Sequence, residues 1–389
     1  MQFVIKATTA CNFRCVYCSE GDKKPQDLSF EFFCKLVDDL PELLDEKGDK
    51  SVCVLWHGGE PLLWGLDRLD KAMAYAEQKL SSKYDLEFAM QTNGYLLDEA
   101  FMDMMQRHKL SAGVSLDGYR ELQDANRPTK DGKPTFDRVM QNVQELRRRN
   151  LGGSTLMVLN AQDNIDVDKL FNFIKEYGLV CKINVLVPCG RAEGCADIDA
   201  IRDNYVRIMK VLYERAMQEE GDIIIEPLDK FMDAVISRGS VEDCSHNGHC
   251  GSSIACLYSD GTLGFCGRSI RNKEYSFGSL KEKSLKELYN SALAQEVRTR
   301  DEFLHEHDCR GCPVWYLCHG GCTVEALQAN GTLFSKAPGC AARRELYQYL
   351  ETTGLDLLRK KLIRQKRKYR IILEEKKKIL EEVRQLAGK

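Results

Sequence analysis

Three cysteines stand close together near the start of this 389-residue chain, Cys11, Cys15 and Cys18, in the spacing C-x3-C-x2-C. Cysteine thiolates are the preferred ligands of iron–sulfur clusters, and three of them can hold three irons of a [4Fe-4S] cube. The fourth iron then has no protein ligand and is open to a small molecule. The alternatives are a zinc knuckle or buried free cysteines, but structural zinc normally takes four ligands and no fourth stands within this loop.

A second group of cysteines lies between residues 250 and 340. Its spacing is C-x10-G-x4-C with one further cysteine between these two, then C-x2-C-x5-C-x3-C, then a last cysteine. Eight thiols satisfy two four-coordinate sites. Zinc ribbons also use C-x2-C pairs, so the spacing alone leaves zinc open. The positions are Cys250, Cys256, Cys266, Cys309, Cys312, Cys318, Cys322 and Cys340.

Composition narrows the class of protein. The chain has 17 cysteines and a net charge of -3, but residues 1–8 lack the basic start and apolar core of a secretory signal. We therefore expect the cysteines to ligate metal in a reducing cytoplasm rather than to form a disulfide scaffold. No apolar run approaches the roughly 20 residues that span a bilayer. Six cysteines remain. Cys34, Cys53 and Cys181 are expected in the core, and Cys189 and Cys195 are expected to have structural roles in a loop. Cys244 has no expected role.

The first half of the chain alternates short apolar runs with amphipathic stretches. Strands are predicted at 2–8, 52–56, 86–90, 112–115, 155–159 and 183–187, and helices at 30–44, 66–80, 99–108, 136–149 and 167–177. Six strands interleaved with helices predict an α/β fold with a parallel sheet and right-handed crossovers. The alternation alone does not distinguish an open sheet from a barrel.

Polar residues and glycines follow successive predicted strands. Gly58-Gly59-Glu60-Pro61 follows the second strand, Gln91-Thr92-Asn93-Gly94 the third, and Ser115-Leu116-Asp117-Gly118 the fourth, with Asp124-Ala125-Asn126-Arg127 beyond it. Asn160 follows the fifth strand. Each stretch alone could be an ordinary turn. Because the carboxyl ends of parallel strands meet at one edge, together they predict a binding site there.

These motifs resemble those of the radical S-adenosylmethionine (SAM) superfamily. The resemblance decides for a partial (β/α)6 TIM-like barrel, and implies that SAM chelates the open iron and that Tyr17 lies near its adenine. It also implies that Gly58, Gly59 and Glu60 hold the SAM amino group, and that Ser115 and Arg127 contact its ribose and carboxylate, the latter by forked hydrogen bonding. Further candidate SAM contacts are Gln91, Asn93 and Asn160.

The later cysteines resemble a SPASM domain, which carries two auxiliary [4Fe-4S] clusters. The resemblance assigns Cys250, Cys256, Cys266 and Cys322 to the first, and Cys309, Cys312, Cys318 and Cys340 to the second. Three clusters are therefore expected. The predicted divisions are a radical SAM barrel over 1–235, a SPASM domain over 236–345 and a basic amphipathic helical tail over 346–389.

Related sulfatase maturases oxidise serine or cysteine to formylglycine and carry a basic aspartate directly after the third thiol of the first auxiliary site. Here Cys266 is followed by Gly267, which cannot accept a proton. The favoured function is therefore a peptide maturase that installs a thioether or carbon–carbon crosslink in a ribosomally made precursor peptide. The alternatives are sulfatase-type oxidation and a zinc-stabilised, non-catalytic binding module. The sequence identifies no general base.

The expected partners are the precursor peptide and an electron donor such as flavodoxin or ferredoxin. Apolar residues recur at near-heptad spacing from Leu355 to Leu386, and Lys and Arg are dense from Arg359 to Lys378. Such a helix could pair in a coiled coil, pack on its own barrel or attract an acidic leader peptide. Because the chain begins with the first predicted strand, leader capture is expected to use this helix, the barrel surface or a separate protein. Nucleic acid is not expected, since no further motif supports it.

Overall fold

The structure is a computed structural model that describes residues 1–22, 24–160, 165–193, 197–268 and 275–387. A ten-stranded sheet forms its centre, in the order β10-β9-β8-β1-β2-β3-β4-β5-β6-β7. The strands are β1 (Gln2–Thr8), β2 (Ser51–Gly58), β3 (Asp85–Thr92), β4 (Ser111–Ser115), β5 (Gly152–Leu159), β6 (Cys181–Val185), β7 (Ile225–Glu226), β8 (Ile254–Leu257), β9 (Thr262–Gly264) and β10 (Ser276–Ser279).

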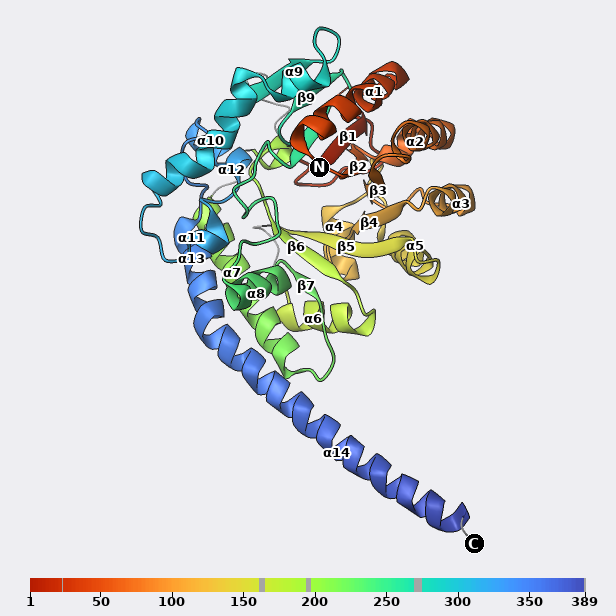
Figure 1. The fold of residues 1–389 in the computed structure, drawn as a ribbon, viewed down its shortest axis with the longest axis vertical. Coiled ribbons are helices and arrows are strands. Elements are labelled where there is room, and N and C mark those ends of the chain that lie inside the picture. The colour runs from red at the N-terminus through yellow and green to blue at the C-terminus, as the bar shows by residue number, and fades with distance from the viewer. Residues whose placement is uncertain (23, 161–164, 194–196, 269–274, 388–389) are drawn as a thin grey trace.

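All neighbouring strands from β8 through β1 to β7 pair parallel, whereas β9 and β10 add antiparallel strands beyond β8. The sheet curves but has two free ends, so the barrel is partial (Figure 1). The α/β class and the parallel sheet are confirmed. The sixth strand was predicted two residues too late, because Leu186 and Val187 are buried beyond the strand's end and apolar pattern reports burial rather than pairing.

Five predicted helices form the crossovers and lie along the outer side of the sheet (Figure 1). They are α1 (Phe30–Lys47), α2 (Leu66–Leu80), α3 (Glu99–Arg107), α5 (Phe136–Arg148) and α6 (Val167–Glu176). In α1, Ser29 caps the first turn by accepting from Glu31 N, and Gly48 ends the helix at φ +71°. The apolar face between these caps, which includes Phe33, Leu36 and Leu40, is buried in the core.

Further helices complete the chain: α4 (Arg120–Asn126), α7 (Ile198–Gln218), α8 (Leu228–Ser237), α9 (Leu285–Tyr289), α10 (Ala292–Glu306), α11 (Trp315–Cys318), α12 (Thr323–Asn330), α13 (Cys340–Tyr349) and α14 (Leu355–Ala387). A π-helical turn, Leu350–Gly354, joins α13 to α14. The predicted long helix at the end of the chain is thus present in the backbone and projects from the body (Figure 1). The apolar repeat from Tyr369 onward lies among side chains outside the described set.

One hydrophobic core runs through the barrel and the cysteine-rich region, and includes Phe3 of β1, Phe265, Phe277 and Leu317. The sheet crosses the predicted division at 235/236, since β8 pairs with β1, and helix crosses the predicted division at 345/346. The domain limits therefore stay predictions. In the described part of the chain, every helix is too short or too polar to cross a bilayer.

Candidate active site

The loop of Cys11, Cys15 and Cys18 leaves the carboxyl end of β1 and lies against the end of β2. Gly59 N donates to Thr8 O at 2.8 Å, and Glu60 N donates to Ala10 O at 2.8 Å. A Cβ on Gly58 would lie 2.3 Å from Thr8 O, and one on Gly59 would lie 2.3 Å from Ala10 O. Only glycine fits at either position, so the two glycines bring the second loop directly against the cysteine loop.

Glu60 is buried at this edge of the sheet with 1% exposure. Its carboxylate accepts from Thr92 Oγ1 at 2.7 Å, Asn93 N at 2.7 Å and Leu62 N at 3.2 Å. Burial raises the pKa of the Glu60 carboxyl to about 7, although these three donors act to lower the pKa. The side chain is therefore fixed in position, and its charge changes near neutral pH.

The loop after β3 contacts the cysteine loop through Asn93. Asn93 Nδ2 donates to Asn12 Oδ1 at 2.7 Å and lies 3.9 Å from Cys11 Sγ. Gln91 Nε2 donates to Ser115 Oγ at 3.0 Å, which links the ends of β3 and β4. The structure thus brings these predicted site residues together along one edge.

Arg127 and Tyr17 meet at a buried carboxylate that the sequence analysis did not single out as a ligand. Asp117 is fully buried; its Oδ1 lies 3.0 Å from Arg127 Nε, and Tyr17 OH donates to its Oδ2. The Arg127 guanidinium lies 5.3 Å from the centre of the Tyr17 ring. Asp117 therefore holds both side chains beside the cysteine loop, and Arg127 reaches any ligand already paired.

The loop after β6 closes over the cysteine loop. Arg191 donates from N to Cys18 O at 3.0 Å and from Nη1 to Cys15 O at 2.9 Å. A Cβ on Gly190 would lie 2.1 Å from Cys18 O. The sequence analysis did not predict Arg191 as a site residue, because only its position after a predicted strand pointed to it. Asn160 is buried directly after β5, and its role stays a prediction.

The first auxiliary set lies where the cysteine-rich region joins the barrel. Cys256 is fully buried on β8, opposite Val4 of β1, whereas Cys322 precedes α12 as its N-cap. Burial, and next the nearby Cys266 thiol, raise the pKa of Cys250 above its ordinary value. The pKa of Cys244 is also raised, by burial of its thiol, next by the Asp243 carboxylate and then by the same Cys266 thiol. Cys244 is thus a fifth thiol beside this set, which sequence spacing did not single out.

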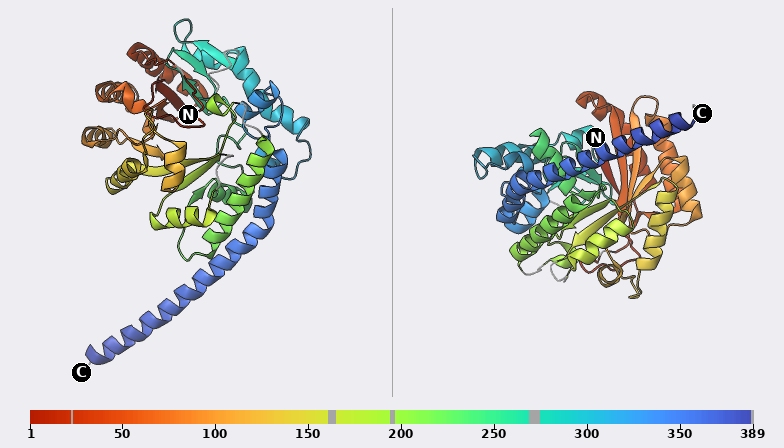
Figure 2. Two further views of the ribbon diagram at one scale, coloured as in Figure 1. Left: turned by 180° about the vertical axis from the view of Figure 1, so that it is seen from behind. Right: turned by 90° about the horizontal axis from the view of Figure 1, so that it is seen from below.

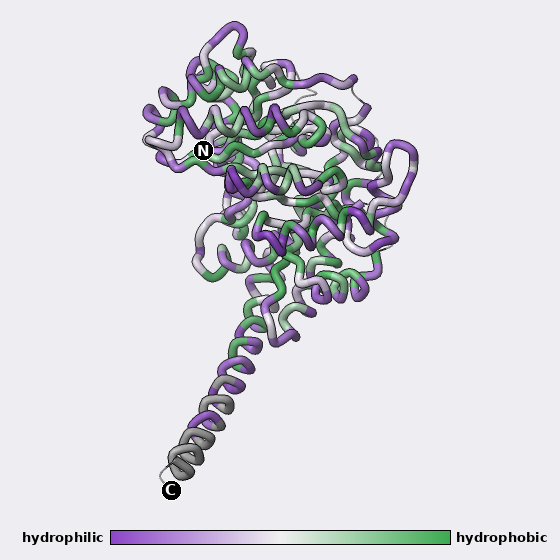
Figure 3. Tube along the Cα trace, turned by 90° about the vertical axis from the view of Figure 1, so that its right-hand side faces the viewer, coloured by the Kyte–Doolittle hydropathy of each residue, from purple (hydrophilic) through white to green (hydrophobic). Residues whose placement is uncertain are grey.

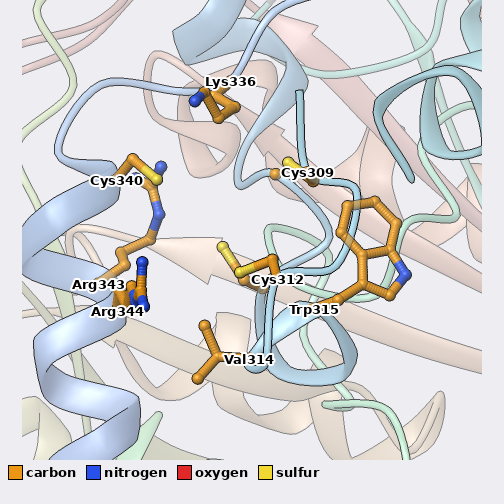
Figure 4. Close-up of a pocket in the computed structure, with 10 residues that line it drawn as sticks. Cys309, Cys312, Val314, Trp315, Lys336, Cys340, Arg343 and Arg344 are labelled. Atoms are coloured by element: carbon orange, nitrogen blue, oxygen red, sulfur yellow. The ribbon is translucent and has the colours of Figure 1, made fainter. Parts of the chain in front are cut away.

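The second auxiliary set lines a single pocket at the start of α13 (Figure 4). All four predicted thiols border it, together with Lys336, Arg343 and Arg344. Arg343 donates to Ala337 O and Pro338 O, each at 2.6 Å, and so fixes the loop before Cys340. The pocket combines four thiols with cations, which suits a negatively charged cluster.

The chemistry of the thiols fits iron–sulfur clusters in all three sets. Burial raises the pKa of Cys11 to about 12, that of Cys15 to about 11 and that of Cys322 to about 11. Buried thiols in this state keep their protons unless a metal replaces them, since the metal ligand is the thiolate. Cluster binding is thus expected to release protons and to stabilise the fold.

A buried charged group occupies the place beside Gly267. A Cβ on Gly267 would lie 3.2 Å from Lys6 Cε and 3.5 Å from Lys6 Nζ. Lys6 Nζ lies 2.6 Å from Glu20 Oε1 and 3.5 Å from His57 Nδ1. Burial, and next the Lys6 ammonium, lower the pKa of His57 to about 3, so the imidazole is neutral. Sequence pattern could not reveal this group, because Glu20 and His57 lie 14 and 51 positions from Lys6.

The cysteines outside the three sets have mixed environments. Cys181 is buried, as expected, but Cys34 and Cys53 are only partly buried. Cys34 lies on α1 and Cys53 on β2. The apolar pattern of the sequence predicted more burial than these two side chains have. Cys189, which was expected to have a structural role in its loop, is also buried, whereas Cys244 as a whole residue is exposed. Cys195 lies outside the described residues.

Comparison with known families matches two parts of the chain. Residues 5–174 match the model of the Radical SAM superfamily, and residues 244–313 match SPASM, an iron-sulfur cluster-binding domain. These two domains imply a SAM-binding [4Fe-4S] cluster and auxiliary clusters.

Similar proteins include the cysteine-type anaerobic sulfatase-maturating enzyme of Clostridium perfringens, 24% identical over 88% of this chain and 94% of the relative. The serine-type anaerobic sulfatase-maturating enzyme of Klebsiella aerogenes is 26% identical over 83% of this chain and 79% of the relative. Among solved structures, anSMEcpe with bound AdoMet superposes with a TM-score of 0.80 at 19% identity, covering 92% of this chain and 99% of that one. SuiB of Streptococcus suis bound to S-adenosylmethionine gives 0.64 at 16% identity, covering 87% and 76%. Both structures share the fold.

Proposed function

Because the chain combines a radical SAM domain with a SPASM domain, we propose that it removes hydrogen from a residue of a ribosomally made precursor peptide and leaves an intramolecular thioether or carbon–carbon crosslink. Bound SAM would supply the hydrogen-abstracting radical, after one electron from a donor such as a flavodoxin or ferredoxin. Formation of the new bond from the substrate radical would then release one proton to solvent and one electron, which an auxiliary cluster held by the later cysteines would accept. The protein's own residues then decide where the substrate lies and which protons can leave.

The SAM end of the barrel is preorganised for this task. Glu60 is held by three donors within hydrogen-bond distance, so its carboxylate can accept from the SAM amino group without being reoriented. Asp117 fixes Arg127 and Tyr17 on the other side of the cysteine loop. We infer that Cys11, Cys15 and Cys18 hold the SAM-binding cluster between these two groups and that the loop of Arg191 covers it.

The residue at position 267 is the main argument for one reaction over the other. The sulfatase maturases that this chain resembles have a basic aspartate at this position, and here the space beside the glycine backbone holds the Lys6 side chain, 3.5 Å from an ideal Cβ. The Lys6 ammonium is paired with Glu20 at 2.6 Å. A cation at this point cannot take a proton from the substrate, which favours crosslinking over aldehyde formation.

The test is co-expression with the short open reading frame beside its gene, followed by tandem mass spectrometry of the peptide. A crosslink removes two hydrogens, so we expect the mass to fall by about two units per bond, with fragmentation suppressed inside the ring. A matched co-expression with Cys11, Cys15 and Cys18 replaced by alanine should return the peptide unchanged. An aldehyde at Ser or Cys without a ring would contradict crosslinking.

Formylglycine formation is the second candidate, because the relatives reported above are sulfatase-maturating enzymes. It requires a base other than residue 267. Incubation of the reconstituted enzyme with a synthetic peptide that carries a sulfatase-type Cys or Ser motif distinguishes the two functions. An aldehyde that reacts with a hydrazide probe would support this candidate, and no hydrazide-reactive product would support the crosslinking proposal.

A further inference from the structure

The helix α14 faces the body with its cations. Lys361 is only 5% exposed and donates from Nζ to Gly221 O at 2.9 Å and to Ala216 O at 3.3 Å. Gln365 Nε2 donates to Glu220 O at 3.0 Å, and Lys368 pairs with Glu220. Residues 361, 365 and 368 lie on one side of a helix, which here packs beside α7 (Figure 2).

The opposite side presents aliphatic residues to solvent. Leu362 is 54% exposed and Ile363 is 52% exposed. Arg359, Lys366 and Arg370 are also exposed. Arg359 and Lys366 lie three to four residues from the pair, and Arg370 lies one turn beyond Lys366, so all three share its face. A helix that served only to pack on its own body would bury Leu362 and Ile363 rather than Lys361. This inversion indicates that the outer side has a partner.

Positive charge is concentrated along the same stretch. Eight of the twelve residues from Arg359 to Arg370 are Lys or Arg, and none is Asp or Glu, in a chain whose net charge is -3. Arg359, Lys366 and Arg367 form no ion pair with any side chain that the structure describes. Figure 3 shows apolar and polar positions close together on the part of α14 nearest the body. The partner must therefore be acidic and carry apolar side chains of its own.

We propose that this outer face of Arg359, Leu362, Ile363, Lys366, Arg367 and Arg370, the arm face, docks an acidic amphipathic segment of the peptide substrate outside the modified residues. The inference rests on the proposed function, since it assigns the surface that recruits its substrate. Twelve helical residues extend about 18 Å, enough to contact a partner helix of about three turns. Surface cations would speed the encounter, and the Leu362–Ile363 pair would hold the segment in place.

Other occupants fit the face less well. Two copies of the arm face would place cation against cation, which disfavours pairing with a second copy. A nucleic acid would meet the cations, but the centre of the face is an aliphatic pair rather than an aromatic stacking platform. An acidic amphipathic peptide satisfies both the charge and the apolar centre.

Binding can be measured on the anaerobically purified full-length protein with a fluorescent 18-residue peptide that places Glu and Leu on opposite faces of a helix. A scrambled peptide of the same composition and an 18-nucleotide single-stranded DNA are compared with it. We expect the amphipathic peptide to bind at least tenfold more tightly than either, with an affinity that falls as salt rises. Equal binding of the scrambled peptide, or tighter binding of the DNA, would overturn the proposal.

Two variants test the face itself. Arg359→Glu with Lys366→Glu and Arg367→Glu should weaken peptide binding about tenfold or more, and Leu362→Ser with Ile363→Ser should abolish the preference over the scrambled peptide. The controls are Lys71→Glu with Lys283→Glu for charge and Ile236→Ser for exposed apolar area, since Ile236 is 57% exposed on α8. These controls should bind like the unaltered protein. Unchanged binding by either arm variant would overturn the proposal.

Sedimentation and substrate turnover separate the remaining outcomes. The charge variant should sediment like the unaltered protein, and a dimer that this variant dissociates would assign the face to a second copy and overturn the proposal. With a precursor peptide that the enzyme modifies, the charge variant should raise KM about tenfold with little change in kcat. Unchanged KM would refute the docking inference alone, whereas a product other than a crosslink would refute the proposed function alone.

Discussion

The two auxiliary cysteine sets use the same ligand type but are held by different parts of the fold. In the first set, Cys256 lies on β8 and is paired through the sheet with Val4 of β1. In the second set, the thiols come from loops and short helices, and Cys340 is exposed at the start of α13 (Figure 4). The first set therefore has one thiol, Cys256, in the barrel wall, whereas the second has none on a strand that the structure describes.

This difference separates their expected roles. Lys6 is the next inward-facing residue after Val4 on β1, and it lies beside Gly267, which directly follows the Cys266 thiol. The first set and the barrel interior are thus connected through the single strand β1. The second set has no such strand among the described residues, and its electrostatic neighbours are Arg343, Arg344 and Lys336. We infer that the first set is close to the substrate and that the second serves electron transfer towards the surface.

The largest effect is expected when Cys11, Cys15 and Cys18 are replaced together by alanine. These thiols lie outside both auxiliary sets, so about eight irons of an expected twelve should remain while SAM cleavage is lost. Iron analysis of anaerobically purified protein and assay of 5′-deoxyadenosine check both parts. Continued SAM cleavage by the triple variant would show that the open iron lies elsewhere.

Cys256→Ala and Cys340→Ala test the comparison of the two sets directly. Each should cost about four irons, but only Cys256→Ala removes a fully buried side chain from the sheet. We expect Cys256→Ala to lower the free energy of unfolding by about 1–3 kcal/mol more than Cys340→Ala, as cavity formation adds to metal loss. Anaerobic thermal denaturation measures the difference, and equal losses would mean that both sets support the fold alike.

Lys6→Met tests the buried pair beside the first set. The side chains of Lys6 and Glu20 are only 5% and 11% exposed, so removal of the ammonium takes a cation from a buried carboxylate, at a cost of up to about 3–5 kcal/mol. Burial acts to lower the pKa of Lys6, but the Glu20 carboxylate together with the Cys256 and Cys266 thiols outweighs burial, and the pKa is raised. The double variant Lys6→Met with Glu20→Gln should recover much of the lost stability in urea denaturation. No recovery would show that packing of the lysine chain, rather than its charge, is what matters.

The sequence alone supports much of the fold and of the candidate site. All six predicted strands lie within a few residues of their observed bounds, because each is a short apolar run between turn residues. The resemblance to SPASM domains, rather than spacing alone, grouped the four thiols that line the pocket of Figure 4. Sequence pattern works where the residues concerned lie close together in the chain. It could not find the pairing of β8 with β1, the carboxylate of Asp117 between Tyr17 and Arg127, or Lys6 beside Gly267, because these contacts join distant segments.

The smallest expected effect is a pH dependence of SAM affinity through Glu60, at the opposite side of the comparison from the thiol sets. Burial raises the pKa of Glu60 to about 7, so below that pH the carboxyl is protonated and is a weaker acceptor for the SAM amino group. Between pH 6 and pH 8 its charged fraction rises from about one tenth to about nine tenths, and SAM affinity should rise up to about ninefold.

Glu60→Gln removes this contribution and leaves only the pH effect of SAM itself, so the difference between the two proteins isolates Glu60. Anaerobic equilibrium dialysis with labelled SAM measures both. Parallel pH profiles would show that Glu60 does not contact SAM, and that the three donors around it serve only to join the loops after β2 and β3.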